Sequence, residues 1–363
     1  MKKNEQTIII KNFGPISNAE IKIKKAVVLI GGQGSGKSTI IKLISTFMWL
    51  EKDLYRSTIT GESDFEKYFR KDVKELLRYH RIDDYCKENT SIEYQGLAFK
   101  FSFSNDKLHS EKMGNDFIYP QIIYIPATRN LTFQIDNLKA GNYIHFGLRD
   151  FIGDFQIAAS NFKYPLKLPF SKAEITKGEF NTLRLKEGGE YDIKLSDASS
   201  GFQAVAPMLL LAEYLQKKMT DGNYGEKNSD APKATSFVNI VEEPEQNLFP
   251  EAQMQVVKNL VEICNRNDDN NKLIISTHSP YVLATINNLI LAGKVSKENP
   301  EKVAEKVCQD LWLSYDDVFA AIVEDGTVNE LKDKDFDMIP MEQIDAVSRI
   351  INEEFDYLYE YEV

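Results

Sequence analysis

Apolar residues in the first fifty positions fall into three short runs and then change period. The runs are TIII at 7–10, AEIKI at 19–23 and AVVLI at 26–30, each of strand length. A Gly-Pro turn signal lies between the first two, so we expect them to pair as a hairpin. From Lys37 onward the period becomes helical, with apolar residues at Ile40, Ile41, Leu43, Ile44 and Phe47. The pattern therefore predicts a hairpin, a third strand and a helix that follows it.

The next stretch, residues 51–119, differs in character and is predicted to be an inserted lobe. Residues 65–88 have the pattern of a charged amphipathic helix, and residues 91–104 alternate as a hairpin does. A core strand is expected at 121–130. Residues 140–195 mix short strand-like runs with Gly and Pro, which predicts a mixed arm whose topology the pattern leaves open.

Beyond residue 200, strand-like and helix-like segments alternate. The expected elements are a helix at 202–218, a polar linker at 220–235, a strand at 236–242, a helix at 251–265, a strand at 272–276, a helix at 280–287 and a strand at 288–291. Such alternation indicates an α/β protein with a mainly parallel sheet and helices on both faces. We expect one head, formed by residues 1–50 and 120–300, with an antiparallel N-terminal subdomain.

The C-terminal segment, residues 301–363, has two features of its own. An Asp-Gly turn between apolar runs predicts a hairpin at 319–331. A helix is then indicated by one apolar stripe, at Ile344, Val347, Ile351, Phe355 and Leu358. We expect the hairpin and the helix to pack on the head.

Composition narrows the class of protein. The chain has 363 residues, 42% of them apolar, and a formal net charge of −11. It has no apolar run of membrane-spanning length and no apolar signal-peptide core, so we expect a cytoplasmic protein with no membrane partner. Its three cysteines lie far apart, which argues against a zinc site or a disulfide framework. The acidic balance disfavours nucleic-acid binding over the whole surface but leaves room for a local basic patch.

The sequence GGQGSGKST fits the phosphate-loop pattern G-x-x-x-x-G-K-[ST] between a predicted strand and a predicted helix. Glycines let backbone amides approach phosphate oxygens, and the N-terminus of the following helix adds positive potential. Lys37 would reach the β- and γ-phosphates, and Ser38 would ligate Mg²⁺. The predicted nucleotide-binding residues of this loop are Gly31, Gly32, Gln33, Gly34, Ser35, Gly36, Lys37, Ser38 and Thr39.

The buried strand at 236–242 runs into two adjacent carboxylates, Glu242 and Glu243. Unpaired buried charge is costly, so a cation or a reaction is expected beside them. Next to a phosphate loop, one carboxylate would hold Mg²⁺ and the other would orient or deprotonate the attacking water. We assign Glu242 to the metal because it ends the strand nearer the phosphates, and Glu243 to the water.

Two weaker signals accompany these motifs. Residues 199–201, Ser-Ser-Gly, open an apolar helix, a pattern that is also common at helix N-caps. KLIISTHSPYVL at 272–283 places His278 at the carboxyl end of a buried strand, before a Ser-Pro helix start. A lone histidine is more often structural. At the sheet edge that carries a phosphate loop, however, a contact from His278 to the γ-phosphate is the better hypothesis.

The four motifs GGQGSGKS, SSGFQ, IVEEPE and STHSP, in this order, resemble the ATP-binding-cassette (ABC) class of ATPases, and within it the soluble branch with the SMC and RecF proteins. EEPEQNLFP followed by STHSPYVL, together with IIYIPATRN and LSDASSGFQ, is similar to the predicted ATPases related to the overcoming-lysogenization-defect (OLD) family, many of which belong to bacterial anti-phage systems. The resemblance covers most of 1–50, 121–131 and 195–292. It implies an SMC-type P-loop head with ATP and Mg²⁺ as cofactors.

The resemblance also implies roles for individual residues. Glu242 and Glu243 would be the Walker B pair and His278 the switch histidine, with Lys37 as the third catalytic group. A signature would bind the ATP that the opposite subunit carries, through Ser199, Ser200, Gly201 and Gln203. Residues 245–248 would form a loop that crosses between subunits. The expected assembly is a homodimer, or a higher even oligomer, bridged by ATP.

The chain departs from this class at several positions. Glu242 stands where the class has an aspartate, and Phe249 stands where related proteins often have a histidine. Ala127 occupies the strand end at which a metal-sensing glutamine is usual. For Arg129 two interpretations stay open: a phosphate or cross-subunit contact, and a structural salt bridge.

Two functions fit these residues. In the first, the chain is an ATPase that senses or clamps and then controls a separately encoded protein effector, as the resemblance to phage-defence ATPases implies. In the second, it is a RecF-like DNA-binding ATPase of DNA repair or maintenance, in which the lysines and arginines of 65–81 contact DNA phosphates. Acidic residues in the same segment favour an ordinary solvated charged face instead. The segment after the histidine motif is too short for a typical nuclease domain, so we expect no nuclease activity in this chain.

Overall fold

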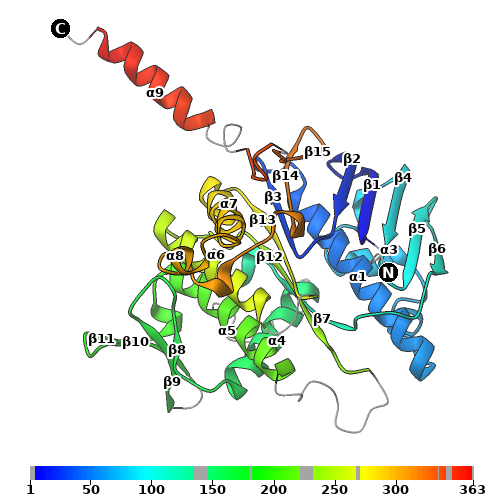
Figure 1. Ribbon diagram of the computed structural model, residues 1–363. Coiled ribbons are helices and arrows are strands. Elements are labelled where there is room, and N and C mark those ends of the chain that lie inside the picture. The colour runs from blue at the N-terminus through cyan, green and yellow to red at the C-terminus, as the bar shows by residue number, and fades with distance from the viewer. Residues whose placement is uncertain are drawn as a thin grey trace.

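The computed structural model describes residues 5–133, 146–179, 182–220, 232–266, 270–333, 335–340 and 346–361. Most of the expected linker 220–235, and Ile344 of the expected C-terminal stripe, lie outside the described residues. The body is built around one large sheet (Figure 1), whose strands are β1 (Thr7–Phe13), β2 (Ile16–Lys22), β3 (Ala26–Ile30), β4 (Cys86–Gln95), β5 (Phe99–Ser104), β6 (Lys107–Lys112), β7 (Pro120–Ile125), β12 (Ser236–Glu242), β13 (Lys272–Thr277), β14 (Val318–Glu324) and β15 (Thr327–Glu330).

The sheet has a parallel half and an antiparallel half. Its strand order is β6-β5-β4-β1-β2-β15-β14-β3-β13-β12-β7, and the last five strands pair in parallel. Strands β3 and β12 are buried along their whole length, as expected for parallel strands covered on both faces. The predicted mainly parallel core sheet is confirmed.

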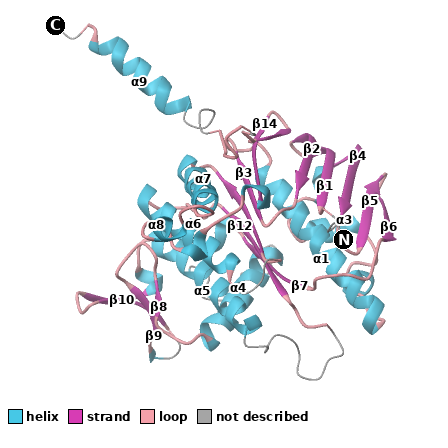
Figure 2. Ribbon diagram, viewed as in Figure 1, coloured by secondary structure: helices cyan, strands magenta, loops and turns pink. Residues whose placement is uncertain are grey.

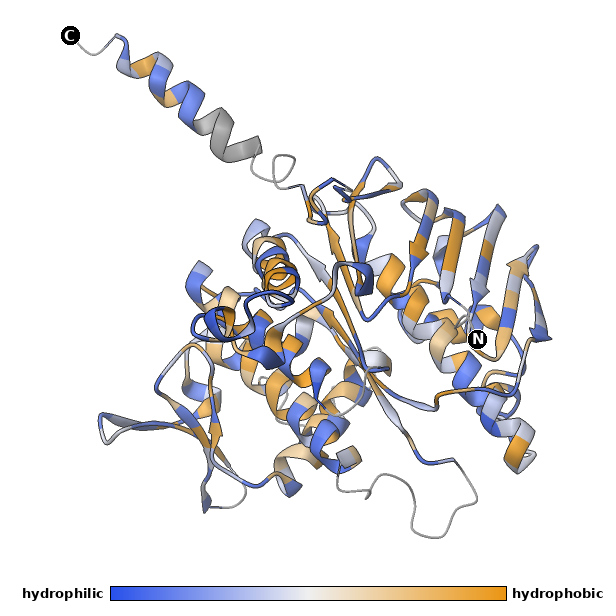
Figure 3. Cartoon of the chain, in the orientation of Figure 1, coloured by the Kyte–Doolittle hydropathy of each residue, from blue (hydrophilic) through white to orange (hydrophobic). Residues whose placement is uncertain are grey.

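Helices cover both faces of this sheet (Figure 2). Helix α1 (Lys37–Thr60) packs on one face, and α4 (Phe146–Asn161), α5 (Ser200–Thr220), α6 (Pro250–Asn265) and α7 (Pro280–Val295) pack on the other. Figure 3 shows the hydrophobic residues gathered on the central strands and on the helices that flank them. This is the two-sided arrangement that the alternating pattern predicts.

The expected inserted lobe is not a separate unit. Helix α1 runs past residue 50, and β4 pairs with β1, so β4–β6 continue the main sheet. The buried carboxylate of Glu51 joins the two parts, because it accepts hydrogen bonds from the amides of Ala98 and Phe99 and from the Tyr94 hydroxyl. Burial raises the pKa of Glu51, and these three donors act against that shift.

The predicted helix at 65–88 is broken into short pieces. These are α2 (Asp64–Tyr68), α3 (Val73–Arg78) and a 3₁₀ turn, Asp83–Tyr85. Arg70 and Lys71 between them adopt positive φ angles of 48° and 60°, and Asp72 caps α3 by accepting from the amide of Lys74. The segment has the predicted periodicity of charged residues, but the positive φ angles and the cap at Asp72 end one helix and begin another.

The strand expected at 288–291 is instead the last part of α7. Ser279 caps this helix and Pro280 begins it, and Leu289 and Ile290 are buried while Leu291 is 38% exposed. An apolar run that contains leucines fits a buried helix as well as a strand, so periodicity alone gives no decision there.

The mixed arm resolves into two parts. Helix α4 packs into the main core, while a small antiparallel sheet stands apart from the large one (Figure 2). Its strand order is β11-β10-β9-β8, with β8 (Leu166–Lys167), β9 (Glu174–Lys177), β10 (Leu183–Glu187) and β11 (Tyr191–Lys194).

The C-terminal segment differs most from expectation. The hairpin β14–β15 forms around the Asp325-Gly326 turn, but it lies inside the main sheet, between β2 and β3, rather than on its surface. Helix α8 (Pro300–Ala304) precedes it. Helix α9 (Ala346–Tyr359) projects away from the body, and Phe355 and Leu358 of its stripe are 63% and 68% exposed (Figure 1). The described side chains of this helix, residues 352–359, do not pack on the head.

Within the described part of the chain, every helix is too short or too polar to cross a lipid bilayer.

Candidate functional site

The loop at 31–39 connects β3 to α1, as its sequence predicts. Lys37 is 4% exposed, and its ammonium donates to the carbonyls of Gly31 at 2.8 Å and Gly32 at 2.7 Å. Burial lowers the pKa of Lys37, and the nearby carboxylates of Glu243 and Glu245 act in the opposite direction. The lysine is thus folded into a loop of backbone groups, in the position from which it would meet phosphate oxygens.

Gly36 is held at the start of α1 by both conformation and space. Its φ angle is 107°, and a Cβ atom there would lie 2.3 Å from Cδ1 of Ile16. Gly34 also has a positive φ, 74°, but a Cβ there would meet nothing within 4 Å. A side chain at position 34 would therefore introduce backbone strain alone, whereas a side chain at position 36 would add a steric clash.

We expect Gly36→Ala to lower the free energy of unfolding by about 2–4 kcal/mol, because left-handed strain and a steric clash add up. Gly34→Ala should cost only about 1 kcal/mol, from the strain alone. Urea denaturation of both variants beside the wild type measures the difference. Equal costs would show that contact with Ile16 is not what makes residue 36 a glycine.

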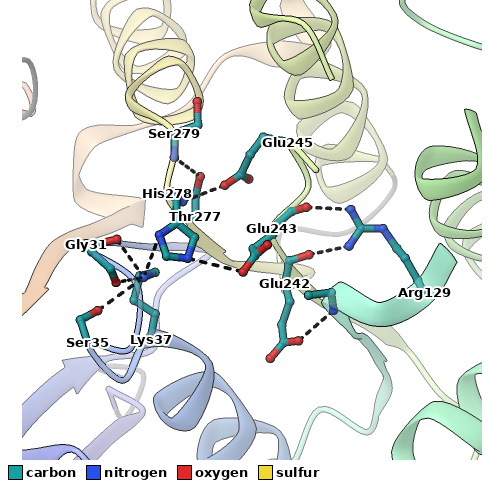
Figure 4. Close-up of polar contacts among 12 residues, drawn as sticks. Gly31, Ser35, Lys37, Arg129, Glu242, Glu243, Glu245, Thr277, His278 and Ser279 are labelled. Atoms are coloured by element: carbon teal, nitrogen blue, oxygen red, sulfur yellow. Dashed lines mark hydrogen bonds and ion pairs between the residues drawn. The ribbon is translucent and has the colours of Figure 1, made fainter. Parts of the chain in front are cut away.

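Glu243 has a strained backbone at the end of β12. Its φ angle is 44°, in the left-handed region, and its amide donates to the Ser276 carbonyl at 2.8 Å. Figure 4 shows that this turn aims the Glu243 side chain toward His278, while the Glu242 side chain points the other way. Backbone strain of this kind persists where surrounding contacts enforce it, and it is concentrated at functional sites.

Arg129 provides those contacts. Its guanidinium is fully buried and donates to the carbonyls of Glu242 at 2.6 Å, Glu243 at 2.7 Å and Ala204 at 2.8 Å. It forms no ion pair within 4.0 Å among the described residues, so a contact salt bridge does not describe it, and its burial leaves no surface for a phosphate. Both interpretations drawn from the sequence are therefore wrong. Arg129 fixes the backbone of the two glutamates and ties it to α5.

The Glu242 carboxylate is buried and already has polar partners. It accepts from the Tyr124 hydroxyl at 2.5 Å and from the Ala127 amide at 2.8 Å, and the Lys42 ammonium lies 3.9 Å from its Oε1. Sequence reasoning missed Tyr124 and Lys42. The missing signal was strand order, since β7 pairs with β12 and brings Tyr124 beside Glu242.

The donor set fits Mg²⁺, which takes oxygen ligands and keeps waters. Ser38 and the two glutamates supply hydroxyl and carboxylate oxygens, and each Glu242 oxygen still has a lone pair after its hydrogen bond. The described residues contain no cluster of three or more His, Cys, Asp or Glu side chains that could hold a metal ion. Phosphate and water oxygens would therefore have to complete the shell, as is usual for Mg²⁺ at nucleotide sites.

His278 lies between the lysine of the loop and Glu243. Its Nδ1 is 3.5 Å from the Lys37 ammonium, and its Nε2 is 3.4 Å from Glu243 Oε1 (Figure 4). An ammonium can only donate, so in a neutral imidazole Nδ1 accepts and Nε2 carries the hydrogen that faces the carboxylate. The predicted catalytic residues Lys37, Glu243 and His278 are thus brought into one line.

The loop after the glutamates supports this histidine. Glu245 accepts a hydrogen bond of 2.7 Å from the amide of His278, and Ser279 donates to Gln253 on α6 at 2.5 Å. The first contact joins the end of β13 to the segment 245–248, and the second joins the start of α7 to α6. Sequence reasoning assigned that segment to a subunit crossing and did not foresee its contact with His278 in the same chain.

The predicted signature residues lie at the N-terminus of α5. Ser199 and Ser200 are exposed, and the hydrogen bonds between described residues include none from these serines to the loop at 31–39. A Cβ atom at Gly201 would lie 2.8 Å from the Asn247 carbonyl, so α5 begins against the loop after the glutamates. The Gln203 side-chain amide donates to the carbonyls of Ser196 and Ala198, which shapes the approach to the helix.

Three of the six lysines and arginines in 65–81, the cations proposed for DNA, form ion pairs within the chain. Lys71 lies 2.6 Å from Glu66, Lys74 lies 2.7 Å from Asp106, and Arg78 lies 3.0 Å from Asp83. With the helix broken between α2 and α3, these side chains do not form one continuous basic face. The geometry favours a solvated charged surface over a phosphate-binding one.

Solved structures that are similar to the chain include three SMC heads. An SMC head bound to the C-terminal winged-helix domain of ScpA is 11% identical, covers 92% of this chain and 98% of its own, and has a TM-score of 0.41. The SMC head domain of Thermotoga maritima is 13% identical, with coverages of 90% and 97% and a TM-score of 0.36. A Pyrococcus furiosus SMC head with an extended coiled coil, bound to the C-terminal domain of ScpA, is 11% identical, with coverages of 96% and 98% and a TM-score of 0.40. Similarity this low carries no argument about function.

A comparison with curated proteins finds no match. A family model described as an AAA ATPase domain matches residues 6–140 and 127–283. These stretches contain the loop at 31–39, both glutamates and His278, and together they span more than half of the chain. The chain therefore belongs to the AAA ATPase domain family.

Proposed function

We propose that this protein is a Mg²⁺-dependent ATPase that closes into an ATP-bridged dimer and controls a separate protein. The observation that carries the proposal is the line from Lys37 through His278 to Glu243, which places a cation, a switchable imidazole and a carboxylate at one sheet edge. Such a set suits phosphoryl transfer to water.

Each residue has a task in the proposed reaction. Lys37 would exchange the carbonyls of Gly31 and Gly32 for phosphate oxygens, and His278 would donate from Nε2 either to Glu243 or to the γ-phosphate. Glu243 would orient and deprotonate the attacking water. Ser38 and Glu242 would hold Mg²⁺, which supplies neutralisation of the charge that develops on the phosphates.

The dimer is proposed because, among the described residues, no hydrogen bond joins Ser199 or Ser200 to the phosphate loop of the same chain. Ser199 and Ser200 are exposed at the start of α5, a helix of 21 residues whose N-terminus carries positive potential. A γ-phosphate delivered by a second copy would meet these amides and hydroxyls. The resemblance to ATPases of anti-phage systems supports defence as the setting and a separately encoded effector as the output.

We expect Ser200→Arg to weaken ATP-dependent dimerisation by roughly a hundredfold, because a bulky cation would occupy the anion site at the helix N-terminus. Light scattering of the wild type with Mg²⁺ and a non-hydrolysable ATP analogue should show a doubling of mass, which the variant loses. Ser314→Arg, on an exposed loop at the opposite end of the parallel strands, is the matched control.

Two outcomes would contradict the proposed assembly. If the mass of the wild type does not respond to the analogue, the protein is a single-site ATPase. If Ser200→Arg still dimerises, the signature does not lie in the interface. Nucleotide affinity of the variant, measured below the dimerisation concentration, should match the wild type if its own loop at 31–39 is undisturbed.

A further inference from the structure

A cavity of about 240 Å³ lies beside the edge strand β7, between α1, α3 and α4. Its floor is buried, since Ser45, Thr46, His80 and Phe151 are each at most 6% exposed. Drug-sized ligands occupy pockets of about 300–1,000 Å³, so this volume suits a smaller molecule. Nothing in the proposed hydrolysis uses the cavity.

The walls of the cavity are aromatic. Trp49 packs edge-on against Phe69, with ring centroids 5.6 Å apart, and the His80 ring lies 4.6 Å from that of Tyr124. Tyr79 adds a further ring, 4.8 Å from His80. Faces of aromatic rings attract cations as well as other rings, because their quadrupoles present negative charge above the plane.

Two carboxylates stand at the rim. Asp150 and Asp154 are exposed and lie one turn apart on α4, where like charges repel by a few tenths of a kcal/mol. Arg149 reaches Asp150 at 4.0 Å, whereas none of the ion pairs between described residues involves Asp154. Although solvent reaches the Asp154 side chain, partial desolvation and, secondarily, the charge of Asp150 raise the pKa of its carboxyl to about 6. Asp150 has the Arg149 guanidinium and the Tyr79 hydroxyl beside it, so the negative charge that a bound cation would relieve is chiefly that of Asp154.

The cavity is connected to the ATP site by two of its walls. The Tyr124 ring lines it, and the Tyr124 hydroxyl donates to Glu242 Oε1 at 2.5 Å. Ser45, Thr46 and Trp49 belong to α1, the helix that begins at Lys37. A molecule that presses on Tyr124 or α1 would therefore act on the groups that hold the metal and the phosphates.

We propose that this cavity is a regulatory site for a small aromatic amine, with its ring among Trp49, Tyr79 and Tyr124 and its ammonium between Asp150 and Asp154. Binding is independent of the proposed function. The expected effect of binding on ATP turnover rests on the proposed ATPase function.

The test of binding is a fluorescence titration of the full chain with 2-phenylethylamine. The chain has two tryptophans, Trp49 in the cavity and Trp312 elsewhere, so Trp49→Phe identifies the reporter. We expect a saturable change that Trp49→Phe removes, and an affinity about tenfold lower for the neutral isostere 2-phenylethanol. Asp150→Asn/Asp154→Asn should lower the affinity for the amine by about tenfold and leave that for the alcohol unchanged.

The control is Glu301→Gln/Glu305→Gln, an exposed acidic pair with the same spacing at α8. This pair should leave binding unchanged. The site is overturned if no saturable change occurs, if Trp49→Phe keeps it, or if the two acidic pairs have equal effects. Equal affinities for amine and alcohol would overturn the selectivity for a cation.

A second measurement addresses regulation. Saturating 2-phenylethylamine should change ATP turnover of the wild type at least twofold and leave that of Asp150→Asn/Asp154→Asn unchanged at the same concentration. Binding without any change in turnover would overturn the coupling through Tyr124. Absence of ATP turnover with intact binding would instead contradict the proposed ATPase, so the two failures are distinguishable.

Discussion

Glu243→Gln is expected to lower ATP turnover by about 10²–10⁴-fold while nucleotide binding is retained. Glutamine keeps the shape of the side chain and its place 3.4 Å from His278, but it takes up no proton from water. The measurement is phosphate release by wild type and variant under saturating ATP and Mg²⁺, beside nucleotide affinity from equilibrium binding.

Glu251→Gln is the matched control, because this glutamate is exposed in the first turn of α6, a few residues further along the chain. It should hydrolyse ATP at the wild-type rate. If Glu243→Gln also retained that rate, Glu243 would not be the group that activates water, and Glu242 would have to be tested in its place. A loss of both binding and turnover would indicate a structural role for Glu243.

Arg129→Ala is expected to lower the free energy of unfolding by about 3–5 kcal/mol, because several buried carbonyls lose their donor, and to abolish turnover. The substitution removes a buried donor from the carbonyls of Glu242, Glu243 and Ala204, which then lack that partner. Burial lowers the pKa of Arg129 to about 10, so the guanidinium is still charged at neutral pH and its charge faces the nearby glutamates. Urea denaturation measures the stability.

Arg129→Lys separates positioning from folding. Lysine keeps the charge but loses the planar fork that reaches several carbonyls at once. We expect kcat to fall by about tenfold or more while nucleotide affinity stays near that of the wild type, because Glu243 loses its enforced backbone and the loop at 31–39 does not. A variant with reduced stability and unchanged kcat would show that Arg129 supports the fold alone.

Much of the fold follows from periodicity. Strands β3, β12 and β13 and helices α1, α5 and α6 lie where hydrophobic spacing predicts them, since burial on one or two faces imposes that spacing. The errors lie where a local feature or a distant partner overrides the pattern. Capping at Asp72 breaks the expected helix at 65–88, and Phe355 and Leu358 of the apolar stripe on α9 are exposed.

The candidate site was predictable in part for the same reason. Glu242 ends a buried strand, and Lys37, Glu243 and His278 come after buried strands. Parallel strands end at one edge, so the proximity of these residues follows from the order of motifs. The polar partners of these residues could not be predicted from the order of motifs. Tyr124, Lys42 and the carbonyls that Arg129 binds come from other strands and helices, and a hydrogen bond requires a geometry that no linear pattern encodes.

The amino-acid sequence by itself determined the class of protein: an α/β phosphate-loop ATPase, with the residues that would bind phosphate and activate water. These depend on short contiguous motifs, in which neighbouring backbone groups and side chains act together. Only the tertiary structure decided that β14 enters the centre of the sheet, that Arg129 holds the strained turn at Glu243, and that a cavity adjoins Tyr124. Each of these results from the packing of segments far apart in the chain, where strand order and side-chain shape, rather than local spacing, set the contacts.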